Sequence, residues 1–150
     1  MTDEPAIARA IIDSNSYMVL GTADANGSPW ASPVWFATEG GEFVWVSSPE
    51  ARHSRNLAVR PQLSIVIFDS TVIPGDGQAV YMAATAEELT GDAIDAGLEV
   101  FACGSEAAGL RVWTRDDVVA PARHRIYRAV TSEHFILNER DERVPITLSP

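Results

Sequence analysis

Short segments rich in β-branched and aromatic residues, separated by turn signals, most constrain what this chain can fold into. One turn signal is Asp24-Ala25-Asn26-Gly27, in which Asn-Gly supplies the positive φ of a tight hairpin. Predicted strands cover residues 17–23, 30–38, 42–47, 62–69, 79–89, 124–132 and 133–137. Helical spacing of apolar residues predicts a helix near the N-terminus and another over residues 92–101. This pattern favours a mainly β fold with α decoration, a small antiparallel barrel in one domain over residues 1–150.

Three of these segments carry further information. Thr2 or Asp3 can cap the first helix. Pro33 cannot donate a ladder hydrogen bond, so its strand is predicted to lie at a sheet edge, to contain a bulge, or to have something packed on its backbone. In residues 62–69 apolar side chains occupy both alternating positions, which predicts that both faces of that strand are buried.

The segment 44–60 is predicted to contain the end of a strand, a break in the chain direction and the start of a helix. Ser48 can cap this helix, Pro49 suits its first position, and Pro61 lies near its end. The first two turns carry four side chains able to contact an anion: Arg52, His53, Arg55 and Asn56. Free backbone N–H groups, a helix dipole and cationic side chains together favour an oxyanion or a phosphate. The alternative interpretation is a surface helix with a solvated basic face.

The overall charge of the chain makes this basic segment unusual. The chain has 11 Lys+Arg against 21 Asp+Glu, for a formal net charge of -10. Such a chain has no general attraction to nucleic acid or to an anionic membrane. Residues 52–60 nevertheless contain three arginines and a histidine, with no acidic residue after Glu50. This local exception indicates a small anionic ligand rather than a polyanion.

Other site types leave no clear signal in the sequence. The single cysteine, Cys103, is predicted to be a buried structural thiol in a reducing compartment. Cys and His residues do not show metal-ligand spacing, glycine-rich phosphate motifs are absent, and we cannot name a catalytic acid or base. The N-terminus is acidic, unlike a signal peptide, and no apolar run approaches the ~20 residues of a membrane span. We therefore expect a cytoplasmic protein that binds neither membrane nor nucleic acid.

The order of elements resembles the pyridoxamine 5′-phosphate oxidase-like family of the FMN-binding split-barrel superfamily. The resemblance rests on the strands 30–38 and 42–47, the helix start SSPEARHSRNL and the strand QLSIVIFDS, and it covers roughly residues 5 to 138. It implies a six-stranded antiparallel split β-barrel of the FMN-binding type. It also implies a homodimer that binds flavin in two clefts between its subunits.

The resemblance further implies a set of cofactor-binding residues. Second-strand residues along the isoalloxazine ring would be Ser32, Pro33, Val34 and Trp35. Residues near the ribityl chain and phosphate would be Val46, Ser47, Ser48, Arg52, His53, Arg55 and Asn56. His53 would add positive charge only when protonated. Trp113 would come from the other subunit to cover the ring.

The function implied is an FMN-binding oxidoreductase that acts on an unidentified small molecule. Members that oxidise pyridoxamine phosphate carry an arginine early in the second strand and a basic C-terminus. This chain instead has Trp30-Ala31-Ser32 and the tail VPITLSP, so the resemblance does not indicate that substrate. Three alternatives stay open: an F420-dependent reductase of the same fold, a non-catalytic flavin-binding protein, and a dimer without cofactor.

Overall fold

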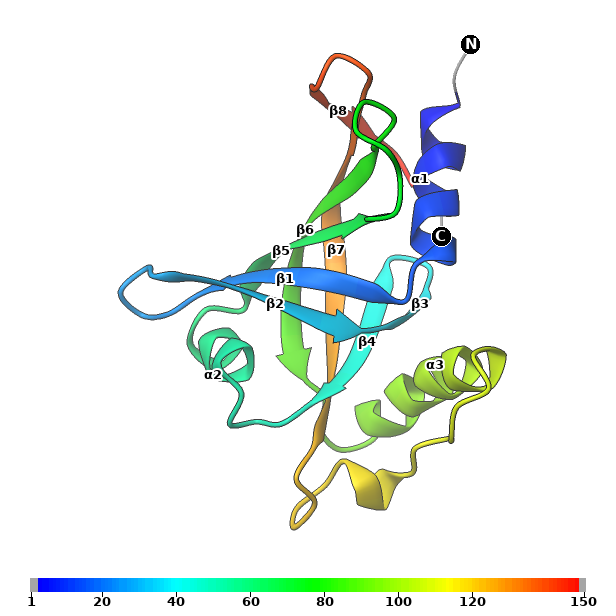
Figure 1. Ribbon diagram of the computed structural model, residues 1–150. Helices are drawn as coiled ribbons and strands as arrows, with labels where there is room; N and C mark the ends of the chain where they lie inside the picture. The colour runs from blue at the N-terminus through cyan, green and yellow to red at the C-terminus, as the bar shows by residue number, and fades with distance from the viewer. Residues whose placement is uncertain (1–2, 149–150) are drawn as a thin grey trace.

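The computed structural model describes residues 3–148, and in that range it contains eight strands and three helices (Figure 1). The strands are β1 (Tyr17–Ala23), β2 (Pro29–Trp35), β3 (Ala37–Glu39), β4 (Glu42–Ser47), β5 (Gln62–Phe68), β6 (Ala79–Glu88), β7 (Arg125–Leu137) and β8 (Arg143–Ile146). The helices are α1 (Glu4–Ser14), α2 (Arg52–Val59) and α3 (Ala93–Ala107), and a 3-10 turn spans Arg115–Asp117. None of the helices within residues 3–148 is long and apolar enough to cross a membrane.

All eight strands belong to one curled antiparallel sheet in the order β2-β1-β5-β6-β7-β4-β3, with β8 paired to β7. Six strands have six or more residues, in agreement with the six that the family resemblance predicts. The short strands β3 and β8 are additions, and β8 lies where the sequence predicted only a tail. The sheet is therefore the mainly β split barrel expected from the sequence.

The hairpin β1–β2 follows the sequence prediction closely. Gly27 adopts φ 83°, and Asp24 accepts hydrogen bonds from the backbone N–H groups of Asn26 and Ser28. Since β2 is the first strand of the sheet, Pro33 lies on an edge strand, opposite Val19, as its missing N–H requires.

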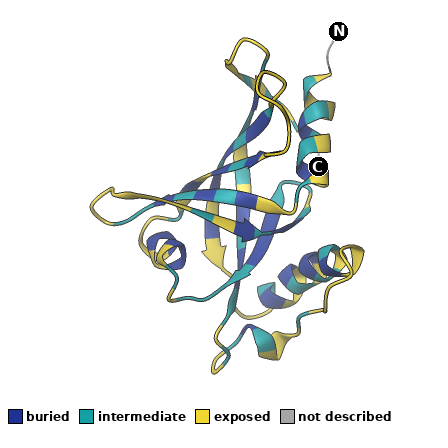
Figure 2. Ribbon diagram, viewed as in Figure 1, coloured by how far each residue is buried: buried dark blue, intermediate teal, exposed yellow. Residues whose placement is uncertain are grey.

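The three helices cover different parts of the curled sheet. Helix α1 is capped by Asp3, whose side chain accepts from the N–H of Ala6, and it buries Ala8 and Ile12 in the barrel core. Helix α2 packs on β1, β2 and β6 and adds Leu57 to the same core. Helix α3 packs on β3, β4 and β7 over a second apolar cluster, whose centre includes Phe101. Figure 2 shows the buried residues of these helices on the sides that face the sheet.

Several sequence predictions require correction. Strand 30–38 is interrupted at Phe36 and continues as β3. The predicted strands 124–132 and 133–137 form the single strand β7, whose bulge lies opposite Ala83 and Ala84 and absorbs the break in the pattern. Helix α3 ends at Ala107 rather than at residue 101, and it places Cys103 on its exposed side, so the predicted burial of that thiol is wrong.

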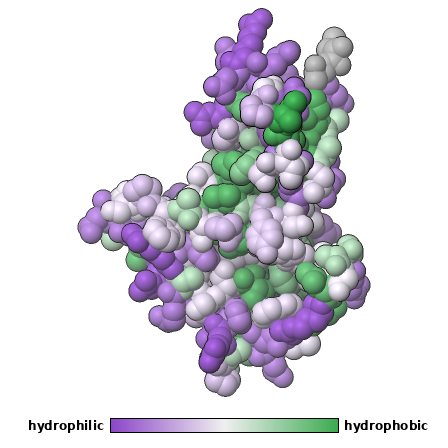
Figure 3. All heavy atoms as spheres, in the orientation of Figure 1, coloured by the Kyte–Doolittle hydropathy of each residue, from purple (hydrophilic) through white to green (hydrophobic). Residues whose placement is uncertain are grey.

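The prediction for residues 62–69 is also wrong on one face. Leu63, Ile65 and Ile67 are buried, whereas the alternate side chains of β5 are exposed or half-buried. Cross-strand pairing extends this open face as one apolar row over six strands: Pro33, Val19, Val66, Tyr81, Phe135 and Pro145. Figure 3 shows hydrophobic residues on the side of the molecule between the β1–β2 hairpin and the β5–β6 loop. No helix of the described chain covers this row.

Candidate functional site

The proposed anion site lies where β4 ends and α2 begins. Ser48 does not cap the helix: its hydroxyl accepts from the N–H of Glu50 at 3.1 Å, and its carbonyl accepts from the N–H of Ala51 at 3.1 Å. A turn therefore precedes the helix, and α2 begins at Arg52, three residues after the predicted first position, Pro49. Its N-cap is Ala51, and no side chain caps it. The N–H groups of the first turn are thus left for a ligand or for water.

His53 is held inside this turn rather than presented to solvent. It is 8% exposed, and its Nε2 lies 2.9 Å from the hydroxyl oxygen of Ser47 at the end of β4. Burial lowers the pKa of His53 below its ordinary value, because desolvation disfavours the charged imidazolium. Near neutral pH the free protein therefore holds His53 mainly as neutral imidazole.

Asn56 connects α2 to the β1–β2 hairpin. Its side-chain amide donates to the hydroxyl of Thr22 at 3.0 Å, and that hydroxyl donates to the carbonyl of Trp30 at 3.4 Å. Asn56 and Thr22 are both buried. Arg60, just past the helix, donates to the carbonyls of Asp24 and Ala25 at 2.7 and 3.0 Å. These residues fix the position of α2 against the hairpin, and the amide of Asn56 is already engaged there.

Arg52 and Arg55 are the two cationic side chains left exposed at the start of α2. The Arg52 guanidinium lies 4.3 Å from the centroid of the Trp30 ring, a cation–π distance. No ion pair among residues 3–148 involves either arginine. The nearby Glu50 is exposed at the surface. The site thus combines two arginines that have no carboxylate partner with uncapped N–H groups, which is an arrangement suited to an anion.

The remaining predicted cofactor residues lie in two other environments. Val34 belongs to the barrel core, whereas Ser32 and Pro33 lie along the edge strand β2. Val46 and Trp35 pack against the cluster under α3. There the rings of Trp35, Phe101, Trp113 and His124 contact one another edge to face, with centroid distances of 5.3, 6.3 and 5.3 Å. Trp113 therefore packs within its own chain against Phe101, the ring that also contacts Trp35.

Sequence reasoning missed two contributors to the site. Trp30 lies under Arg52, and Thr22 bridges Asn56 to the hairpin, but a strand tryptophan and a strand threonine have no sequence signal for such roles. The spacing of Arg52 and Trp30 becomes meaningful only after the hairpin packs on α2.

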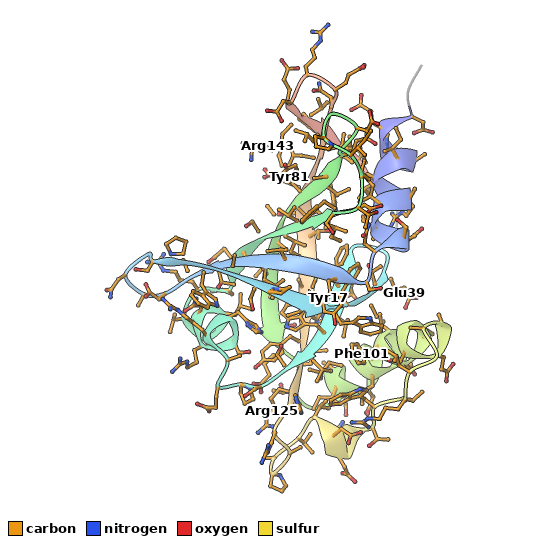
Figure 4. All side chains as sticks on the ribbon, in the orientation of Figure 1. Tyr17, Glu39, Tyr81, Phe101, Arg125 and Arg143 are labelled. Atoms are coloured by element: carbon orange, nitrogen blue, oxygen red, sulfur yellow. The ribbon has the colours of Figure 1, made fainter. Side chains whose placement is uncertain are left out.

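A hollow of about 600 Å³ lies on the open face of the sheet. It is lined by Ser64, Ile65, Val66, Tyr81, Met82, Ala83, Phe135 and Arg143. The Arg143 guanidinium lies 5.3 Å from the Tyr81 ring centroid, and Figure 4 shows the two side chains close together. The small residues Ser64 and Ala83 face each other across β5 and β6 and leave room between the larger side chains. The hollow thus combines an apolar surface with one cation.

Metal binding has no support in the described part of the chain. Among residues 3–148, no three His, Cys, Asp or Glu side chains lie close enough together to hold a metal ion.

The chain is similar to one protein family and to several solved structures. The family model described as pyridoxamine 5′-phosphate oxidase matches residues 5–135. A heme binding protein from Mycobacterium smegmatis is 25% identical with a TM-score of 0.76, covering 98% of this chain and 59% of that one. The heme storage protein HutZ from Vibrio cholerae is 26% identical with a TM-score of 0.74, covering 91% of this chain and 95% of that one. An F420 reductase is 15% identical with a TM-score of 0.62 over 84% of this chain and 94% of its own, a likeness in fold alone. No curated protein matches the sequence.

Proposed function

Because the chain belongs to the pyridoxamine 5′-phosphate oxidase family, we propose that it binds FMN and acts as a flavin-dependent oxidoreductase on a small organic molecule. The observation that carries this proposal is the start of α2, where Arg52 and Arg55 are exposed beside an uncapped helix N-terminus. In a chain with a formal net charge of -10, such a site favours a compact anion such as the FMN phosphate.

The residues present fit the phosphate end of FMN. Arg52 and Arg55 would supply charge-assisted hydrogen bonds, and the first-turn N–H groups would supply neutral ones. Ser47 is half-buried beside them and offers a hydroxyl. Asn56 would act indirectly, because its amide holds the hairpin rather than facing a ligand. Glu50 is exposed, which is compatible with a carboxylate directed away from the phosphate.

A bound flavin would supply the redox chemistry, and the chain would hold it in position. The aromatic cluster that contains Trp35 and Trp113 would shape the substrate side of the site. The proposed step does not require a catalytic acid or base, because transfer of a hydride depends mainly on the positions of donor and acceptor.

We also propose that the site is completed in a homodimer. The apolar row Pro33-Val19-Val66-Tyr81-Phe135-Pro145 lies on a sheet face that no helix covers, and its neighbours Tyr17 and Phe68 are 60% and 47% exposed. A second copy of the chain, with the same row, would bury this surface through a two-fold interface. The hollow beside Tyr81 and Arg143 would then be enclosed between subunits, where its apolar wall suits a planar ring.

The hydrogen bonds that Arg60 already makes favour FMN over F420 as the ligand. The longer acidic tail of F420 would need basic surface beyond Arg52, and Arg60 is the nearest candidate in the sequence. Its guanidinium is already bonded to the carbonyls of Asp24 and Ala25. A tail that recruited Arg60 would have to break those bonds.

A second candidate is heme binding, because two heme proteins share 25% and 26% identity with most of this chain. The chain spans 59% of the length of the M. smegmatis protein, so that protein's function as a whole is not carried over. Heme iron needs an axial side chain such as histidine. His53 and His134 already lie 2.9 and 2.8 Å from hydroxyl groups, whereas His124 packs edge to face on Trp113. His124 is therefore the histidine we would test as a heme ligand.

The colour and the ligand preference of the purified protein test these proposals. The apoprotein would be titrated with FMN, F420 and hemin, with binding followed by flavin fluorescence and by the Soret absorption of heme. FMN binding tighter than that of F420 and hemin, with a reducible bound flavin, supports the proposed function. Stoichiometric hemin binding that His124→Ala abolishes, without FMN binding, would replace it by the second candidate.

A further inference from the structure

The contact between His53 and Ser47 joins the first turn of α2 to the end of β4. The His53 Nε2 and the Ser47 hydroxyl oxygen are 2.9 Å apart, within hydrogen-bond distance. His53 is buried, while Ser47 is only half-buried. Of the two side chains, Ser47 is therefore the one better placed to reach a ligand.

Two proton arrangements satisfy this contact. If His53 carries its proton on Nε2, the imidazole donates to Ser47 and leaves the serine proton free. If the proton is on Nδ1, the serine donates to Nε2 and has no proton left for a ligand. The doubly ionised phosphate of FMN, the main form above pH ~6, accepts hydrogen bonds and offers none, so only the first arrangement gives it a donor at Ser47.

Building on the proposed function, we propose that His53 is a positioning residue: its Nε2–H donates to Ser47 and so directs the Ser47 hydroxyl proton to the phosphate of the ligand. In this role His53 contributes through Ser47 as a neutral donor, not as a cation in contact with the phosphate. The burial of His53 supports this role, since a buried imidazolium would have to overcome desolvation before it could serve as a charge. Arg52 and Arg55 supply the positive charge, and Ser47 and His53 supply a directed neutral hydrogen bond.

A double-mutant cycle tests whether His53 acts through Ser47. FMN affinity would be measured for the parent, Ser47→Ala, His53→Leu and the double variant, with circular dichroism and thermal unfolding as folding controls. We expect each single change to weaken FMN binding by about tenfold, the loss of one hydrogen bond to a charged group. The double variant should be no weaker than Ser47→Ala. Additive losses would overturn the proposal, because they would mean that His53 contacts the phosphate independently.

A neutral replacement of His53 distinguishes a role as hydrogen-bond donor from a role as cation. His53→Gln keeps an N–H donor of similar reach without any charge. We expect its FMN affinity to stay within about threefold of the parent, whereas a direct electrostatic role predicts the same loss as in His53→Leu.

Nitrogen-15 NMR of the histidine side chains tests the proton arrangement without any flavin. We expect the Nε2–H tautomer for His53 in the free protein and in the presence of saturating sulfate, a dianion that carries no proton. The Nδ1–H tautomer in the sulfate-bound protein would overturn the proposal. If the parent bound FMN no better than riboflavin, the proposed function would fail separately, whatever tautomer His53 adopts.

Discussion

The guanidinium of Arg52 lies over the ring of Trp30, with its carbon 4.3 Å from the ring centroid. The two residues come from different elements, α2 and the edge strand β2. Trp30 is 42% exposed, so it orders Arg52 without shielding it from solvent or from a ligand. A cation held in one place contributes more to binding than a freely rotating one, because less side-chain entropy is lost.

Arg52→Ala should weaken FMN binding by about tenfold or more, a loss of roughly 1.4 kcal/mol, at every pH where the protein is folded. Trp30→Ala should produce part of the same loss, and Trp30→Phe less than Trp30→Ala, since phenylalanine keeps an aromatic face. Isothermal titration or flavin fluorescence quenching measures these affinities. Arg140→Ala is a control for the loss of one arginine charge, because Arg140 is exposed in the turn between β7 and β8, outside α2 and the β1–β2 hairpin. An unchanged affinity in Arg52→Ala would reduce the start of α2 to a solvated basic face.

Acid should destabilise the protein through two histidines, His53, which is buried, and His134, which is half-buried. Burial lowers the pKa of His53, and burial together with the nearby charge of Arg9 lowers the pKa of His134. The unfolded chain therefore binds protons more readily than the folded one. The stability that these groups contribute is present above the ordinary histidine pKa of about 6.5 and is lost as pH falls through the lower folded values.

Thermal unfolding at a series of pH values from neutral to mildly acidic checks this prediction. His53→Gln should flatten the acid limb of the stability curve, because it removes one group that must be protonated on unfolding. An acid limb identical to that of the parent in both His53→Gln and His134→Gln would show that other groups control acid unfolding.

The open sheet face should be where two copies of the chain meet. Val66→Glu places a charge in the centre of the apolar row, beside Val19 and Tyr81, and should shift the protein to a monomer. Leu110→Glu is a matched control, because Leu110 is 53% exposed in the segment after α3 and lies outside the row. Light scattering at micromolar concentration distinguishes the two outcomes. A parent protein that is monomeric at all concentrations would remove the shared-site proposal.

Gly104 should tolerate no side chain, because α3 approaches β3 closely there. A Cβ on Gly104 would lie 2.7 Å from the Cβ of Ala37 and 3.5 Å from its Cα, so that strand backbone would have to move. Gly104→Ala should lower the free energy of unfolding by roughly 1–3 kcal/mol, although alanine has a higher helix propensity than glycine. The adjacent Cys103→Ala, on the exposed side of α3, should change stability by no more than about 0.5 kcal/mol. Denaturant unfolding measures the stability of both variants. Equal stabilities of Gly104→Ala and Cys103→Ala would mean that α3 can move away from the sheet.

Local rules predicted most of the fold. β1 was predicted with its observed bounds, and the turn at Gly27 and the edge position of Pro33 follow from single-residue backbone chemistry. Predictions failed where tertiary packing overrides local preference. Ser48 and Pro49 satisfy the rules for a helix start, but the chain uses Ser48 in a turn and begins α2 later.

The candidate site was also predicted only in part. The sequence locates Arg52 and Arg55 near a helix start, and both are exposed there. It cannot indicate that His53 turns inward to Ser47 or that Arg52 lies on Trp30, because both contacts join elements that meet only in the folded barrel.

If the start of α2 binds the phosphate of a flavin nucleotide, the protein should distinguish FMN from riboflavin. The two ligands share the ring and the ribityl chain and differ only in the phosphate. We predict that the parent protein binds FMN at least about tenfold more tightly than riboflavin, and that Arg52→Ala removes most of this difference. Equal affinity for the two flavins in the parent protein would mean that the start of α2 does not bind the phosphate.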